Sequence, residues 1–237
     1  MHPSKNLNEL TEEYLLSLKV RNLTESTIKG QRWKLGKFLH YLTGRGVGQA
    51  DHVNKALLLD YQTELYHSPS QQGRPTSIAH QNNMLSAVRS FTGFLKERDY
   101  IVSDPARDIA YGKSPKRLPR SILTRSEARR NINSPDTSCT LGYRDKTIME
   151  VLYTTGIRKE ELNNLTLGDV DYHEGYLRII SGKGRKDRIV PLGRIACRYL
   201  ENYIRSVRPS LIRDPYNHHL FLSSRGNKLS RNVVWEL

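Results

Sequence analysis

Apolar residues recur at three- and four-residue spacing through the first hundred residues, which is the periodicity of helices with one buried face. Four such stretches are separated by polar turns. The second follows Thr24, whose hydroxyl can cap the start of a helix, and this helix should end at Gly44. The third spans about 53–67 and the fourth about 77–98. We predict four helices whose core residues are Leu7, Leu10, Tyr14 and Leu18; Ile28, Leu35, Leu39 and Leu42; Ala56, Leu57 and Leu65; and Met84, Leu85, Val88, Phe91 and Leu95.

A proline-broken basic segment follows the helical part. Asp104-Pro105-Ala106 ends the helical pattern, and prolines then alternate with Lys113, Lys116, Arg117 and Arg120. We predict a first domain of residues 1–112, a linker of residues 113–122 and a second domain of residues 123–237. The linker is either solvated or crosses a phosphate backbone, and its composition does not choose between the two.

The second domain begins with helical periodicity and then changes to the two-residue alternation of strands. Helices are expected from Thr124 (with Glu127 completing a capping box), over 142–156, from Arg158 to Leu165, over 193–207 and over 230–237. Residues 176–180 and 188–192 alternate as strands, and 220–222 are strand-like. The predicted fold class is therefore mainly α with a small β-hairpin or sheet.

The net positive charge is the most informative feature of the composition. The chain has 38 Lys and Arg against 24 Asp and Glu, for a formal net charge of +14. The residues through Lys116 carry +5 and the remainder +9, so both halves are positive. This distribution fits DNA held between two domains better than it fits a basic tail. A basic protein without a polyanionic partner is the alternative.

Other composition features narrow the class of protein. Cys139 and Cys197 are too few for a disulfide framework or a zinc site, and reduced thiols are expected. No apolar run reaches the length of a membrane span, and the N-terminus lacks a signal-peptide core. We expect a cytoplasmic, nucleoid-associated protein.

Two cations stand in unusual local settings. Arg158 falls in the first turn of a helix, after Gly156, where the helix dipole disfavours a cation. Glu161 follows three residues later and is within reach of the guanidinium. Lys183 lies between two glycines in the hairpin loop 181–187, where its ammonium is free to reach a groove. The two cations together could grip a phosphate; the alternatives are a surface ion pair and a solvated turn lysine.

Several segments together resemble the tyrosine recombinase (phage integrase) family, especially its Xer-like branch. They are residues 142–145 (GYRD), 152–162 (LYTTGIRKEEL) and 182–192 (GKGRKDRIVPL). Asp104-Pro105-Ala106 and Leu118-Pro119-Arg120 look like that branch's interdomain junction. The resemblance extends over essentially the whole chain, and the ordered Arg and Lys motifs are its most specific part.

The resemblance implies a four-helix, SAM-like core-binding domain followed by a partial α+β catalytic domain. It implies DNA integration and site-specific recombination through a 3′-phosphotyrosyl intermediate, on double-stranded DNA, by a tetramer on two DNA sites, with no metal or nucleotide cofactor. Arg158 resembles the arginine that stabilises phosphate charge, Lys183 the hairpin lysine that protonates the leaving 5′-oxygen, and Glu161 the supporting acid. The expected DNA contacts are Lys116, Arg117, Arg120, Arg185, Lys186 and Arg188, with Lys34 and Arg89 as candidates on the helices.

The family pattern continues with a His-x-x-Arg box, a His or Trp, and a nucleophilic tyrosine, which these 237 residues do not contain. His218-His219 lacks the arginine, and none of the 13 tyrosines has the nucleophile's context. We expect half an active site, inactive in DNA cleavage alone. The favoured interpretation is a part of a longer recombinase. The alternatives are a natural truncation from a decayed mobile element and a noncatalytic DNA-binding regulator that competes for recombination sites. An RNA-binding protein ranks lower, because the glycine–aromatic signatures of such proteins are missing.

Overall fold

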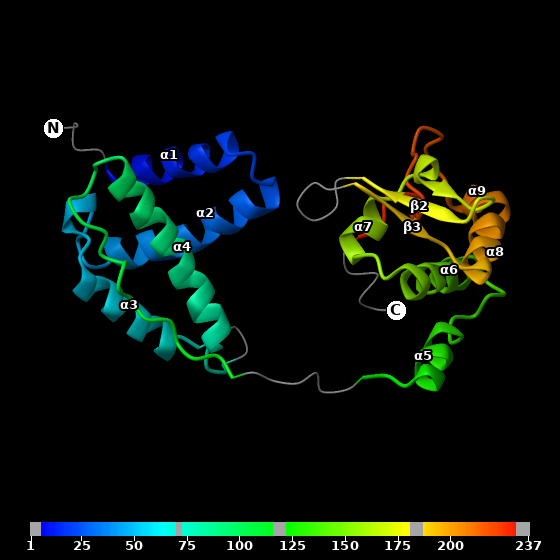
Figure 1. The fold of residues 1–237 in the computed structure, drawn as a ribbon, viewed down its shortest axis with the longest axis horizontal. Coiled ribbons are helices and arrows are strands. Elements are labelled where there is room, and N and C mark those ends of the chain that lie inside the picture. The colour runs from blue at the N-terminus through cyan, green and yellow to red at the C-terminus, as the bar shows by residue number, and fades with distance from the viewer. Residues whose placement is uncertain (1–5, 70–72, 116–121, 181–186, 231–237) are drawn as a thin grey trace. The chain divides into compact units, whose positions relative to one another are not determined.

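The computed structural model describes residues 6–69, 73–115, 122–180 and 187–230. The chain divides into two compact units, Met1–Leu118 and Pro119–Leu237, each with its own hydrophobic core (Figure 1). The predicted helix over 230–237 lies almost wholly outside the described residues. None of the helices in the described ranges has the length and apolar character that a membrane span requires.

Unit 1 contains the four predicted helices. They are α1 (Leu7–Val20), α2 (Glu25–Thr43), α3 (Lys55–His67) and α4 (Ile78–Glu97), with a 3-10 turn, η1, at Ala50–His52. The side chains of Thr24 and Ser77 accept backbone hydrogen bonds at the starts of α2 and α4, as N-caps do. The predicted apolar faces of α1, α2 and α4 form the core, with Leu39 only half-buried.

The predicted buried face of α3 is wrong by one position. Leu58 and Tyr61 are buried, whereas Leu57 and Leu65 are half-buried and Ala56 is exposed. Three consecutive leucines at 57–59 hide the phase of the helix, because one face can take only one of them. The aromatic ring of Tyr61 packs on Phe38 and decides the phase.

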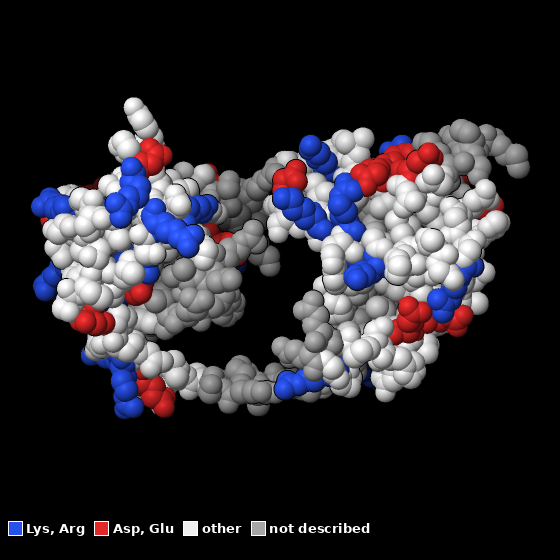
Figure 2. Space-filling model, turned by 180° about the vertical axis from the view of Figure 1, so that it is seen from behind, with Lys and Arg blue, Asp and Glu red and all other residues white. Residues whose placement is uncertain are grey.

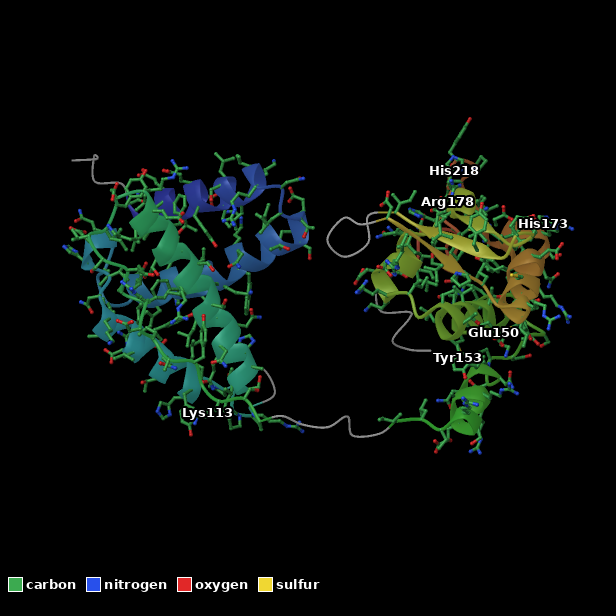
Figure 3. All side chains as sticks on the ribbon, viewed as in Figure 1. Lys113, Glu150, Tyr153, His173, Arg178 and His218 are labelled. Atoms are coloured by element: carbon green, nitrogen blue, oxygen red, sulfur yellow. The ribbon has the colours of Figure 1, made fainter. Side chains whose placement is uncertain are left out.

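The chain beyond α4 remains attached to unit 1 as far as Gly112. Arg89 of α4 donates through Nε and Nη2 to the carbonyl oxygens of Ala106, Arg107 and Ile109 at 2.6–3.2 Å. The Asn82 amide exchanges two hydrogen bonds with the backbone of Gly112, at 2.8 and 2.9 Å. Lys113, the next residue, lies at the edge of this unit (Figure 3).

Unit 2 combines helices with a three-stranded antiparallel sheet of order β1-β2-β3. Its elements are α5 (Arg125–Ile132), α6 (Thr140–Thr155), α7 (Lys159–Asn164), the 3-10 turn η2 (Leu167–Asp169), β1 (Val170–Asp171), β2 (Tyr176–Ile179), β3 (Arg188–Pro191), α8 (Arg194–Asn202), the π-helical turn η3 (Tyr203–Val207) and α9 (Arg208–Leu211). The predicted capping box of Thr124 and Glu127 begins α5. The sequence analysis did not predict β1, η2 or α9. β1 has two residues, which are too few to show an alternation.

The register of β2 and β3 determines which side chains face the core. Leu177 and Ile179 of β2 are buried, and Arg178 lies on the other face of the sheet (Figure 3). Ile179 pairs with Arg188, and Arg178 pairs with Ile189. Directly opposed residues share a face, so Arg188 points to the core side while Ile189 is 68% exposed.

The prediction of a strand at residues 220–222 is wrong. This segment forms isolated bridges, Thr166 with His219 and Leu222 with Lys228. Its backbone is held by side chains instead: Arg208 donates to the carbonyls of Asn217, His219 and Leu220, and Arg144 donates to that of Leu222. Leu220, Phe221 and Leu222 are all buried, so this apolar run belongs to the hydrophobic core and not to a strand of the sheet.

Candidate phosphate-binding site

Gly156 sets the position of Arg158. It ends α6 with φ 60° and ψ 20°, a left-handed conformation that suits glycine. Ile157 is then buried, and Arg158 becomes the N-cap of α7 with an extended backbone. Arg158 therefore lies at the N-cap, just before the helix, whereas the sequence analysis predicted it in the first turn. Its side chain is 57% exposed, so the guanidinium is presented to solvent.

Glu161 holds that guanidinium in place. Its carboxylate accepts from the Arg158 backbone N–H at 2.8 Å and from Arg158 Nη1 at 3.0 Å. Arg188 of β3 donates to both carboxylate oxygens, Nη1 to Oε1 at 2.9 Å and Nη2 to Oε2 at 2.7 Å. The Glu161 side chain is 7% exposed. One buried carboxylate thus fixes two arginines and the start of α7.

The hydrogen bonds from Arg188, followed by those from Arg158, lower the pKa of Glu161 to about 2 against the opposing effect of burial. The carboxylate is therefore charged throughout the physiological range. The same pair raises the pKa of Arg188. The site is a permanent arrangement of one anion between two cations.

Acid should weaken unit 2 through Glu161. A folded pKa below the unfolded one gives a contribution that is present above about pH 4.5 and lost as the pH falls towards 2. We expect Glu161→Gln to remove about 2–3 kcal/mol of unfolding free energy at pH 7 and much less at pH 3. Denaturant unfolding of both proteins at the two pH values measures this. Glu160→Gln, an exposed neighbour in α7, is the control; equal losses at both pH values for Glu161→Gln would contradict the assignment.

The sequence predicted Arg158 and Glu161 as neighbours, and the structure joins them. It also brings in Arg188, which the sequence placed among the phosphate contacts. The sequence analysis did not predict the ion pair of Arg188 with Glu161. Arg188 lies opposite the buried Ile179 in the sheet, and this register turns the Arg188 side chain towards the core side. The Arg188 side chain remains 38% exposed, so a contact with DNA stays a prediction.

The other predicted residues divide into two groups. Lys183, Lys116, Arg117, Arg120, Arg185 and Lys186 lie outside the described residues. Lys34 and Arg89 are half-buried, and Lys34 donates to Asn83 Oδ1 at 2.8 Å. The bonds of Arg89 to three carbonyls favour a structural role for it. Contact of either residue with DNA stays a prediction.

The histidines near the end of the described chain do not join this site. Burial is the main reason that the pKa of His219 is lowered, and its Nδ1 has no hydrogen-bond partner. His218 is exposed, at the surface of unit 2 (Figure 3). Within the described ranges, no three His, Cys, Asp or Glu side chains are grouped as metal ligands.

Comparison with known proteins identifies the family. The sequence pattern of the "Phage integrase family" matches residues 121–237. The chain is 34% identical to tyrosine recombinase XerD of Staphylococcus aureus over 232 residues, which are 98% of this chain and 76% of that protein. The corresponding XerD of Staphylococcus epidermidis is equally similar. The chain belongs to the tyrosine recombinase (phage integrase) family.

Solved structures agree on the fold of this chain. A lambda integrase tetramer bound to a Holliday junction matches 98% of the chain and 62% of its own, with a TM-score of 0.68 at 18% identity. The Tn1549 transposon integrase in complex with circular intermediate DNA matches 93% of the chain and 73% of its own, with a TM-score of 0.67 at 16% identity. The predicted family and the mainly helical fold with a small sheet are therefore confirmed, and recombination is the function of the family.

Proposed function

We propose that residues 1–237 grip duplex DNA through both units and present Arg158 and Lys183 to a backbone phosphate, with Glu161 supporting Arg158, as part of a recombinase active site. The observation that supports this most is the exposed Arg158 guanidinium anchored on a buried carboxylate. A cation fixed before the phosphate arrives stabilises developing charge without reorganisation. The positive charge of both halves supports a polyanionic substrate.

The residues take different parts in this proposal. Arg158 neutralises the nonbridging oxygens of the phosphate. Lys183 donates a proton to the departing 5′-oxygen. Glu161 orients Arg158 and does not touch DNA. Lys116, Arg117, Arg120, Arg185, Lys186 and Arg188 bind neighbouring phosphates and fix the register of the protein on the duplex. Assembly on two DNA sites is proposed by analogy with the lambda integrase dimer and tetramer.

Cleavage needs a nucleophile, and these 237 residues contain no tyrosine in the family's context. We expect the polypeptide of residues 1–237 to bind a nicked suicide duplex without becoming covalently attached to it. Denaturing gel electrophoresis after incubation measures the adduct. A protein–DNA adduct that survives denaturation would show that one of the existing tyrosines acts as the nucleophile. Failure to bind the duplex at all would contradict the proposed function itself.

A further inference from the structure

Lys146 of α6 is the only buried lysine among the residues that the structure describes, with 3% of its surface exposed. Its Nζ donates to Oδ1 of Asn133, the C-cap of α5, and pairs with Oε1 of Glu150, one turn further along α6, at 2.9 Å. The ring of Tyr199 in α8 lies 5.3 Å away, measured from Nζ to the ring centroid. Burial of an ammonium is unfavourable unless partners replace the lost water, so these contacts fix Lys146 where three helices meet.

The segment that Lys146 reaches, residues 123–133, is otherwise weakly attached to unit 2, and we call it the α5 arm. None of its residues is buried, and the hydrophobic core of unit 2 takes its first buried residue at Ile148. Within residues 122–180, the bond from Lys146 to Asn133 is the one side-chain hydrogen bond between the arm and α6. Apolar burial therefore holds the arm only weakly, and the contact with Lys146 contributes a large part of its attachment.

Two hollows lie along the α5 arm. One of about 350 Å³ lies between the arm and α6, and its apolar lining includes Leu123 and Leu152. The other, of about 440 Å³, is lined by residues of the arm, α6 and the start of α8, among them Arg129 and Ile195. Tyr153 of α6 lines both hollows (Figure 3). Closely packed helices leave few spaces of this size, so separation of the arm from α6 disrupts little close packing.

The α5 arm directly follows the predicted linker of residues 113–122. Under the proposed function both units grip the same duplex, and Lys and Arg side chains are exposed on both of them (Figure 2). Uptake of a duplex by two linked units requires reach in the connection between them. The eight residues of α5 form a helix about 12 Å long. Release of the arm from α6 therefore adds an extension of about that length to the linker without exposing a buried residue.

We infer that the α5 arm is a releasable part of unit 2, which separates from α6 while a duplex enters or leaves and docks again through Lys146 and Asn133 once both units are bound. The inference rests on the proposed DNA binding and names the element that moves. A docked arm shortens the connection, which raises the effective concentration of the second unit on the duplex. Lys146 is thus a positioning residue that acts through the arm.

Hydrogen exchange of residues 1–237, followed by mass spectrometry, tests the release of the arm. We expect the amides of α5 to exchange much faster than those of α6, because opening of the arm exposes no core. Asn133→Ala removes the arm's side of the contact and leaves Lys146 paired with Glu150, so it should speed the exchange of α5 about tenfold and leave that of α7 unchanged. Asn131→Ala, at an exposed asparagine of the same helix, is the matched control and should not speed it. Lys146→Met/Asn133→Ala should exchange no faster than Lys146→Met, because both substitutions remove one contact.

Dissociation of a fluorescein-labelled, mixed-sequence duplex, followed by stopped-flow anisotropy, tests the part of the arm in DNA binding. Asn133→Ala should release the duplex about three- to tenfold faster, because the released arm is populated more often. The slope of log K against log salt should stay unchanged, because no phosphate contact is removed.

The inference is overturned if α5 is as protected from exchange as α6, or if Asn133→Ala and Asn131→Ala exchange alike. It is also overturned if the duplex leaves Asn133→Ala at the wild-type rate. If the wild type itself does not bind the duplex, the proposed function fails instead, and the exchange measurements still decide whether the arm is released.

Discussion

Arg208→Met should lower the unfolding free energy of unit 2 by about 3–4 kcal/mol, since it removes a buried guanidinium that donates hydrogen bonds to three backbone carbonyls. Arg208 is 6% exposed, and its Nε and Nη2 donate to the carbonyls of Asn217, His219 and Leu220 at 2.6–3.2 Å. Methionine fills similar volume but leaves those carbonyls without their donors. The melting temperature should fall by roughly 10–20 °C.

The loss should extend to the phosphate-binding site. The segment that Arg208 holds is hydrogen-bonded to the chain after α7, Leu220 N to Leu165 O and Leu167 N to His218 O. α7 carries Glu161 and follows Arg158 directly, so loosening the segment loosens the support of the site. Differential scanning calorimetry measures the stability. Arg225→Met, an exposed arginine near the same segment, is the control, and an equal effect of both variants would contradict this account.

The helices were predictable because their apolar faces repeat. α1, α2 and α4 follow their expected spacing, and the caps Thr24 and Thr124 are where the sequence placed them. α3 could be predicted less well, because three consecutive leucines do not show which of them faces the core. The packing of Tyr61 on Phe38 in the folded unit shows which face is buried. Buried arginines show another limit. Arg144 and Arg208 are ordinary cations in the sequence. Their structural role comes from the backbone carbonyls folded around them and, for Arg144, from the ion pair with Asp145.

The site was predictable in part. The helical spacing linked Arg158 to Glu161, and the bond between them is formed. The sequence places Arg188 among the predicted phosphate contacts and gives no sign that it also pairs with Glu161. Cross-strand register decides the face, and a sequence with a loop of unknown turn type does not fix that register. The carboxylate that pairs with Arg188 comes from a helix 27 residues earlier in the chain.

The largest effect that we expect is the loss of DNA affinity with salt. Eight predicted phosphate contacts, which are the six flanking cations together with Arg158 and Lys183, give a slope of log K against log salt of about −7, and so roughly a ten-thousandfold loss between about 50 and 200 mM salt. Arg158→Ala should reduce the slope by about 1, because it removes one phosphate contact. Arg225→Ala should leave the slope unchanged, because Arg225 is not among the predicted contacts.

The most direct test of a two-unit phosphate grip is therefore a salt titration of duplex DNA binding by residues 1–237. The account predicts a slope near −7 that Arg158→Ala makes shallower by about one. A flat salt response, or an Arg158→Ala slope identical to that of the wild type, would contradict it.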